Sequence, residues 1–155
     1  FVLVVFQIML GGWTSSNYAA LACPDLPMCQ TVWWPNMDFA TGFNFAQDIG
    51  PNYLGGVMDS AARTAIHFSH RIGAIIVTIA VLYLVWRLLK TGLPAAKLWA
   101  VTLAVVLFVQ VSLGLSNVIW SLPLPVAVAH NAVGAMLMLV FVGLSHRFYT
   151  AKVQA

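Results

Sequence analysis

The stretch AIHFSHRIGAIIV, residues 65–77, decides the fold of this chain. It opens an apolar segment that continues to Trp86, yet it carries two histidines and an arginine. Because the bilayer core holds no water, each polar side chain near a membrane segment needs a partner. The stretch therefore raises two questions: whether the segment crosses a membrane, and what its histidines bind.

The composition is that of an integral membrane protein. Of the 155 residues, 61% are hydrophobic and 7% are charged, whereas soluble domains carry about 25% charged residues. The apolar runs 98–118 and 126–144 are each close to the roughly 20 residues that span a bilayer as a helix. The apolar run 72–86 is shorter, and it reaches that length only together with the histidines and the arginine that precede it. The run 1–10 covers about half of a bilayer, so we expect the chain to begin inside a span of a longer protein.

These runs predict an all-α integral membrane protein, a four-helix up-down bundle with a truncated first helix and a long outer loop. We expect one transmembrane domain over 1–155, because short connections favour antiparallel neighbours. The expected spans are 1–12, 63–89, 97–118 and 126–147, with the outer loop at 13–62. This loop is too long for a simple connection. Its aromatic stretch VWWPNMDFATGFNF (32–45) favours a cap on the bundle or in the headgroups over a solvated loop.

The charges predict the orientation of the spans. The acidic residues all lie in the outer loop: Asp25, Asp38, Asp48 and Asp59. Basic residues fill the link between the second and third spans and follow the fourth: Arg87, Lys90, Lys97, Arg147 and Lys152. Because Lys and Arg collect on the cytoplasmic side, we expect both termini in the cytoplasm. The net charge of +3 follows from this bias, so we expect membrane lipid and no nucleic acid as a partner.

Two cysteines, Cys23 and Cys29, lie in the outer loop within CPDLPMC. On the oxidising side of the membrane such a pair predicts a disulfide, which is worth roughly 2 kcal/mol for so small a loop on the chain-entropy account. Zinc is disfavoured, because two cysteines without a nearby histidine supply half of a tetrahedral site. A redox-active pair is the alternative to a structural one.

His70 and His130 are expected at the same depth in the membrane. Counting about 1.5 Å per residue from the outer boundary places His70 about 5 Å and His130 about 6 Å below it. Two level imidazoles on separate spans can hold a heme iron from both sides, which suits electron transfer or anchoring more than oxygen binding. A hydrogen-bonded polar pair and a proton relay are the alternatives. His67, three residues before His70, is either the true ligand or a group beside the ring.

Residues around this pair fit a planar ring. Small side chains follow each histidine by about one turn: Gly73, Ala74 and Gly134. On the third span, Gln110, Gly114 and Asn117 share one small, polar face. Arg71 and Arg63 lie near the outer boundary, where heme propionates need cations, and Arg71 is otherwise an anchor at that boundary. Helix packing alone is the alternative role for the small residues.

Several blocks together resemble the second half of heme A synthase. They are GGWTSSNYAALACPDLPMCQ (11–30), WWPNMDFATGFN (33–44), ARTAIHFSHRIGA (62–74), LGLSNV (113–118) and LPLPVAVAHNAVGA (122–135). The resemblance implies an eight-span protein of two homologous four-helix halves, in which this chain is spans five to eight. It implies that His70 and His130 are the axial ligands of a heme b iron, and that Cys23 and Cys29 are the outer-loop cysteine pair.

The resemblance also implies an activity. Heme A synthases oxidise the C8 methyl of heme O to the formyl group of heme A for cytochrome oxidase, in the bacterial inner membrane. In the first half of that family a glutamate stands where this chain has His67, a departure that fits the cofactor half. The substrate site lies in the missing N-terminal half, so we expect this fragment alone to be inactive. No catalytic residue is identified; the implied partners are heme O, a heme O synthase or an electron donor.

Two other functions share parts of this pattern. A quinone-linked membrane thiol oxidoreductase has four spans and external cysteines, but it typically carries a Cys-x-x-Cys and a second pair. A di-heme membrane cytochrome needs a second level histidine pair near the inner face, where only His146 is available. Spectra of His70 and His130 variants distinguish these functions from a single bis-histidine heme.

Overall fold

The computed structural model describes residues 1–46 and 58–150. Within those residues the regular structure is helical and no strand is present. The helices are α1 (Val2–Ser16), α2 (Phe39–Gly42), α3 (Ser60–Lys90), α4 (Pro94–Ile119) and α5 (Leu124–Thr150). Three of them, α3, α4 and α5, are long and apolar enough to cross a membrane, and α1 is a shorter apolar helix. The predicted all-α class is therefore confirmed, and the three long apolar helices agree in length and composition with a membrane helical bundle. Asp48 and Lys152, which entered the charge pattern, lie outside the described residues.

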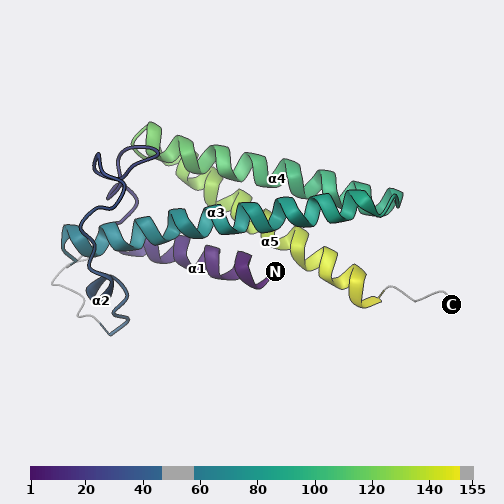
Figure 1. Ribbon diagram of the computed structural model, residues 1–155, viewed down its shortest axis with the longest axis horizontal. Helices are drawn as coiled ribbons and strands as arrows, with labels where there is room; N and C mark the ends of the chain where they lie inside the picture. Colours follow the sequence, from purple (N-terminus) through teal and green to yellow (C-terminus); the bar gives the residue numbers. More distant parts are fainter. Residues whose placement is uncertain (47–57, 151–155) are drawn as a thin grey trace.

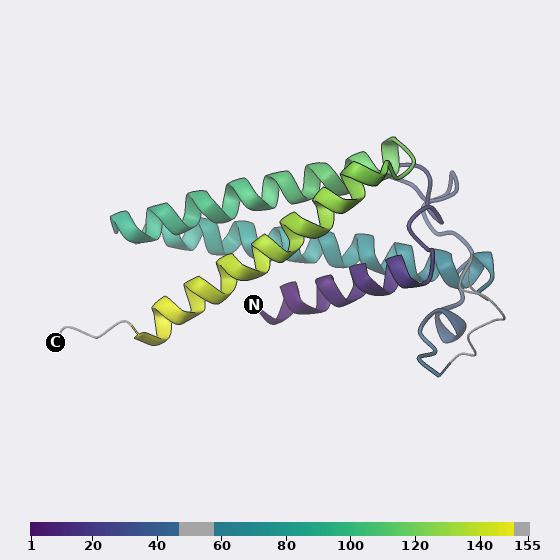
Figure 2. The same ribbon diagram turned by 180° about the vertical axis from the view of Figure 1, so that it is seen from behind.

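The helices lie side by side in the order of the chain. α1 packs against α3, α3 against α4, and α4 against α5, and α1 also meets α5, whereas α3 and α5 make no close backbone contact within the described residues. Figures 1 and 2 show the outer loop and the α4–α5 turn at one end of the molecule and the α3–α4 turn at the other. Thus α1 and α4 run toward the end that carries the outer loop, and α3 and α5 run away from it.

Local signals set the ends of α3 and α4. The Asp59 side chain accepts a hydrogen bond from the Ala62 amide at 2.8 Å, and this N-cap starts α3 at Ser60, three residues before the expected start. At the opposite end, Gly92 adopts a left-handed conformation with φ of 71°, and Pro94 opens α4 at its first position. The turn between the two helices is therefore encoded by a glycine and a proline two residues apart.

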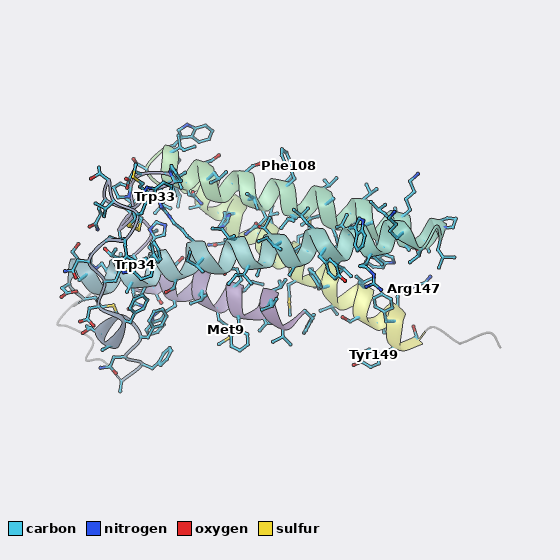
Figure 3. The ribbon with its side chains drawn as sticks, viewed as in Figure 1. Met9, Trp33, Trp34, Phe108, Arg147 and Tyr149 are labelled. Atoms are coloured by element: carbon cyan, nitrogen blue, oxygen red, sulfur yellow. A yellow bond between two sulfur atoms is a disulfide. The ribbon has the colours of Figure 1, made fainter. Side chains whose placement is uncertain are left out.

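The apolar core occupies the half of the molecule away from the outer loop. Its buried members come from α1, α3, α4 and α5 and include Val4, Val81, Leu103, Leu107 and Phe141. Many other apolar side chains point outward, and Figure 3 shows Met9 and Phe108 doing so, with 62% and 73% of their surfaces exposed. Apolar faces directed outward on long helices are those of a multi-pass membrane protein.

The outer loop packs on the start of α3. The indole of Trp13 donates to the Gly42 carbonyl at 2.8 Å, and a Cβ at Gly42 would lie 2.8 Å from the Ala62 carbonyl oxygen, so α2 lies directly on α3. Trp34 meets Phe68 edge to face, with ring centroids 5.4 Å apart. The loop thus caps this end of the molecule, as its aromatic content predicts.

Candidate functional site

His70 is held by side chains of α1. The Gln7 Nε2 donates to the His70 carbonyl at 3.0 Å and lies 3.0 Å from His70 Nδ1. One turn further along α1, a Cβ at Gly11 would lie 3.2 Å from His70 Cε1. Gly73 makes room for the Gln7 amide, because a Cβ there would collide with Gln7 Oε1. The imidazole therefore lies between a glutamine and a glycine of the neighbouring helix.

His130 has the same kind of setting on α4. Its Nε2 lies 3.4 Å from Gln110 Nε2, and a Cβ at Gly114 would lie 3.0 Å from its Cε1. Gly134 in turn faces the Gln110 amide, because a Cβ at Gly134 would lie 3.3 Å from Gln110 Nε2. The predicted small, polar face of α4 is therefore confirmed at Gln110 and Gly114, and it is directed toward α5.

The two imidazoles come from helices on opposite sides of the helix array. His70 is on α3 and His130 is on α5, and these two helices make no close backbone contact in the described ranges 1–46 and 58–150. Both imidazoles are half-buried, and both lie in the same layer, on the stretch of their helices between the apolar core and the outer loop.

This layer contains buried polar atoms that lack a hydrogen-bond partner among the described residues. They are Gln7 Oε1, Gln110 Oε1, Asn117 Oδ1 and His130 Nδ1. An unpaired polar atom away from water costs several kcal/mol, of order 2–7 for an amide or hydroxyl. In the part of the chain that the structure describes, no three His, Cys, Asp or Glu side chains gather around one point. Two imidazoles are the number of protein ligands that a six-coordinate heme iron takes, so the donor set fits a heme.

His67 and Arg71 lie at the outer loop. The Cys23 amide donates to His67 Nδ1 at 3.2 Å, and Arg71 Nε lies 3.3 Å from His67 Nε2. The Arg71 guanidinium also donates to the carbonyls of Asp25 and Met28, at 2.9 Å each, and to that of Cys23. The structure thus makes Arg71 an anchor for the loop. Contact of either residue with a cofactor stays a prediction.

The loop that Arg71 holds contains the predicted disulfide. Cys23 and Cys29 are bonded, with their Cα atoms 4.6 Å apart. The Asp25 carboxylate accepts hydrogen bonds from the backbone amides of Thr31, at 2.7 Å, and Gln30, at 2.6 Å. The bond from Thr31 is the main cause that lowers the pKa of Asp25 below its ordinary value. Gln30 and Thr31 both have left-handed backbones, with φ of 55° and 64°, so Asp25 stabilises a turn that non-glycine residues rarely adopt.

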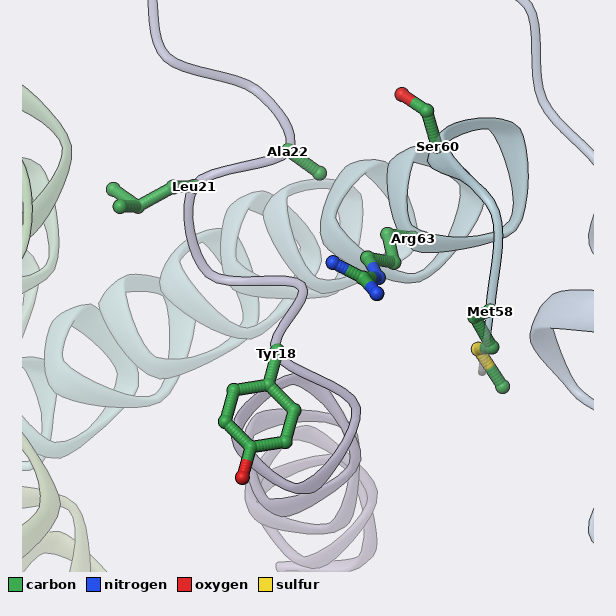
Figure 4. Close-up of a pocket in the computed structure, with 6 residues that line it drawn as sticks. All are labelled: Tyr18, Leu21, Ala22, Met58, Ser60 and Arg63. Carbon is green, nitrogen blue, oxygen red and sulfur yellow. The ribbon is translucent and has the colours of Figure 1, made fainter. Parts of the chain in front are cut away.

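A separate cavity of about 420 Å³ lies at the outer end, beside the start of α3. Figure 4 shows its lining, with the Arg63 side chain directed toward it. The lining residues are Tyr18, Leu21, Ala22, Met58, Ser60 and Arg63. None of the candidate ligands lies there, so the site chemistry belongs to the histidine layer and not to this cavity.

Gln7 and Gly11, which hold His70, were not predicted. The signal for them is a short repeat: QIMLG at 7–11 on α1 and QVSLG at 110–114 on α4 have the same pattern, Gln-x-x-Leu-Gly. Only the copy on α4 was recognised as a polar face. The contact of Gln7 joins residues 63 positions apart, a separation at which helical periodicity carries no information.

Comparison with known proteins gives one consistent family. Residues 1–142 match the family described as Cytochrome oxidase assembly protein. The chain is similar to the heme A synthase of Shewanella oneidensis, at 50% identity, covering 92% of this chain and 43% of that protein. It is also similar to those of Caulobacter vibrioides (30% identity; 88% of this chain, 37% of that protein) and Halalkalibacterium halodurans (26%; 88% and 41%). The chain thus spans less than half the length of these relatives. No solved structure matches it significantly.

Proposed function

The chain belongs to the heme A synthase family of cytochrome oxidase assembly proteins, and from this premise we propose that it is the heme-b-binding half of such an enzyme. The observation that carries the proposal is the pair of imidazoles on α3 and α5, each held by a glutamine and a glycine of its neighbour. Unpaired buried atoms beside them support a bound group that completes the layer.

His70 and His130 are the proposed axial ligands of the heme iron. A heme bound here supplies a one-electron redox centre. Around it, α1 and α4 fix the imidazoles, Gly11 and Gly114 leave room for them, and the apolar core excludes water from the inner side. Arg71 holds the disulfide loop over the outer end. The residues of this chain thus bind and orient; none of them is assigned an acid or base role.

Membership of the family supports a proposal for the activity of the whole protein. We propose that the complete enzyme is an oxidoreductase that oxidises the C8 methyl of heme O to the formyl group of heme A. Its substrate binds in a second, N-terminal half, so this chain alone is inactive, and the heme b relays electrons toward that half or anchors the fold. Heme O, a heme O synthase and an electron donor are the proposed partners.

The same proposal includes the membrane arrangement. The three long helices and α1 form an up-down bundle in the bacterial inner membrane, with both chain ends in the cytoplasm and the disulfide loop outside. The separation of the loop end from the α3–α4 turn supports this orientation (Figure 1), because Arg87 and Lys90 close α3 at the turn.

Absorption spectra of the purified, heme-loaded protein test the ligand assignment. His70→Ala and His130→Ala are each expected to abolish the low-spin spectrum, whereas His146→Ala and Cys23→Ser are expected to keep it. One equivalent of heme per chain is expected, and two equivalents would favour a di-heme cytochrome. A low-spin spectrum that survives both His70→Ala and His130→Ala would overturn the proposal.

A further inference from the structure

The helices α1, α3, α4 and α5 form a closed ring. Each of α3 and α5 meets both α1 and α4, whereas the pairs α3–α5 and α1–α4 make no close backbone contact within residues 1–46 and 58–150. The helices that carry His70 and His130 therefore lie at opposite corners of the ring. A porphyrin plane held by two axial imidazoles stands across the line that joins them. A heme held here would thus present its edges to α1 and α4.

These two edge helices carry matching residues at positions i, i+4 and i+7, a spacing that shares one helix face. They are Gln7, Gly11 and Thr14 on α1, and Gln110, Gly114 and Asn117 on α4. A Cβ at either glycine of these sets would press on an imidazole, so this face is directed into the ring of helices. Thr14 and Asn117 lie three residues beyond the glycines, about 4.5 Å closer to the outer loop.

The two sets differ at the third position. Thr14 is buried, and its hydroxyl donates to the Leu10 carbonyl of the same helix at 2.8 Å. The Oδ1 atom of Asn117 is also buried, but it lacks a hydrogen-bond partner among the described residues. An unpaired buried amide is costly, so this position needs a polar partner. A half turn of the amide exchanges Oδ1 with the NH₂ group, and the turn breaks no bond of the oxygen.

The edge of a heme supplies such a partner. Its two propionates leave the same side of the ring as carboxylates, which accept hydrogen bonds and do not donate them. The apolar core fills the half of the molecule away from the outer loop, so the carboxylates are buried at the lowest cost when they point toward that loop. Asn117 lies on this side of His130, on a helix that faces an edge of the ring.

We propose that Asn117 binds one of the two heme propionates, with its side-chain NH₂ group donating a hydrogen bond to the carboxylate. This inference rests on the proposed function, because it requires a heme held by His70 and His130. The bond fixes the rotation of the heme about the axis through its two ligands, which the imidazoles alone leave free. It also slows heme loss, because a hydrogen bond to a charged group changes an affinity by roughly tenfold or more.

Heme retention by the full-length enzyme tests the proposal, with the protein loaded either with heme b or with its dimethyl ester. The ester has the same ring and iron but no ionised carboxylate. The readout is the rate of heme b release to a heme scavenger, divided by the rate of ester release. Asn117→Leu is expected to raise this ratio roughly tenfold or more, because it speeds the loss of heme b alone. Ser116→Ala is the matched control, since the Ser116 hydroxyl donates to the Ser112 carbonyl of its own helix at 2.8 Å.

Asn117→Asp gives a second measurement with a side chain of the same size. At neutral pH its carboxylate repels a propionate, so the ratio is expected to exceed that of Asn117→Leu. As the pH falls and the carboxyl groups are protonated, the ratio is expected to decrease toward that of Asn117→Leu. Ser116→Ala is expected to keep the ratio of the parent at each pH.

The outcomes separate this inference from the proposed function. If the parent binds no low-spin heme, the proposed function fails, and this inference fails with it. If the parent is low-spin and Asn117→Leu keeps its ratio, Asn117 binds no propionate while the ligand assignment stands. Equal acceleration of both release rates has the same meaning, because it reports packing or a bound water.

A variant that loads no heme is also informative. If Asn117→Leu loads neither heme, Asn117→Asp decides, because a ratio above that of the parent supports the propionate contact and an unchanged ratio overturns it. Failure of both variants to load either heme, beside a loaded Ser116→Ala control, also overturns the contact, since a lost propionate bond does not prevent binding of the ester.

Discussion

Gly11 and Gly114 each lie where a methyl group would press on an imidazole ring. An alanine Cβ would come within 3.2 Å of His70 Cε1 or 3.0 Å of His130 Cε1, so the ring would have to move by a few tenths of an ångström. We expect Gly11→Ala and Gly114→Ala to weaken heme binding by roughly tenfold, the lower end of the range for residues that support metal ligands. Heme retention during titration with a heme scavenger measures the effect.

The control for that prediction is the neighbouring glycine. Gly12 is on the same helix, and a Cβ there meets nothing within 4 Å. Gly12→Ala is therefore expected to bind heme as the parent does. Equal losses in Gly11→Ala and Gly12→Ala would mean that helix propensity or folding, and not the contact with the ring, is responsible.

Asp25 gives the disulfide loop a dependence on pH. Because hydrogen bonds, first of all that from the Thr31 amide, hold its pKa below the ordinary value of 3.8, the carboxylate stabilises the loop at every pH above about 3.8. That stabilisation is lost as the pH falls through the pKa of the folded protein. The measurement is the rate at which a phosphine reduces the Cys23–Cys29 bond, divided by the rate for the same loop as a free peptide. We expect this ratio to stay constant from pH 7 to about 4 and to rise at lower pH.

Asp25→Asn separates the carboxylate from other acid effects. The amide keeps one acceptor oxygen and loses the charge, so the relative rate is expected to be raised already at pH 7 and to change little in acid. A variant with the pH profile of the parent would contradict the role given to Asp25.

Single residues differ in how far their roles could be predicted. The Gln110–Gly114 face could be predicted because spacing along one helix decides it, and His70 and His130 were proposed as a pair because counting along two helices places them at the same depth. Gln7 was not predicted, and neither were the loop contacts of Arg71, because these contacts join segments 43 to 63 residues apart. Helical periodicity fixes the face of a residue, but only packing fixes what that face meets.

Among the elements, the disulfide loop depends most on one side chain. Three backbone carbonyls, those of Cys23, Asp25 and Met28, accept from the Arg71 guanidinium. A lysine ammonium lacks the planar fork that reaches several acceptors at once, and each hydrogen bond to a charged group is worth about 1.5–3 kcal/mol. We expect Arg71→Lys to speed reduction of the disulfide at neutral pH by roughly tenfold or more, measured with the same phosphine assay.

Arg87→Lys is the matched control for that change. Arg87 is on the same helix, at its far end, and donates to the exposed Tyr83 hydroxyl at 3.0 Å. Its replacement is expected to leave the reduction rate unchanged. If Arg71→Lys also left the rate unchanged, the guanidinium would not be what holds the loop.

Elements were predictable where one physical signal dominates. Apolar runs located α1, α3, α4 and α5 to within about three residues at most ends, because length and composition decide a membrane helix. The cap by Asp59 and the four-residue helix α2 were not predicted. α2 is too short for periodicity to register, and its position depends on close contact between Gly42 and Ala62 of α3.

At the scale of the whole molecule, polarity changes along the helices. The half that ends at the α3–α4 turn holds the apolar core, and the half beneath the outer loop holds the histidine layer. Figure 3 shows Trp33 and Trp34 at the loop end and Arg147 and Tyr149 toward the other. This asymmetry places the buried polar atoms near one membrane surface, where a ligand with an apolar ring and charged edges is accommodated at the lowest cost.

The same asymmetry makes the orientation testable. Ser121→Cys, in the α4–α5 turn, and Leu93→Cys, in the α3–α4 turn, introduce single thiols at exposed positions of opposite ends. The parent protein is the control, because both of its cysteines are disulfide-bonded. In bacterial spheroplasts, whose inner membrane is intact, an impermeant maleimide is expected to label Ser121→Cys. It is expected to label Leu93→Cys only after the inner membrane is permeabilised. This result is expected because basic side chains, which flank the α3–α4 turn, collect on the cytoplasmic side. Labelling of Leu93→Cys alone would mean that the protein has the opposite orientation.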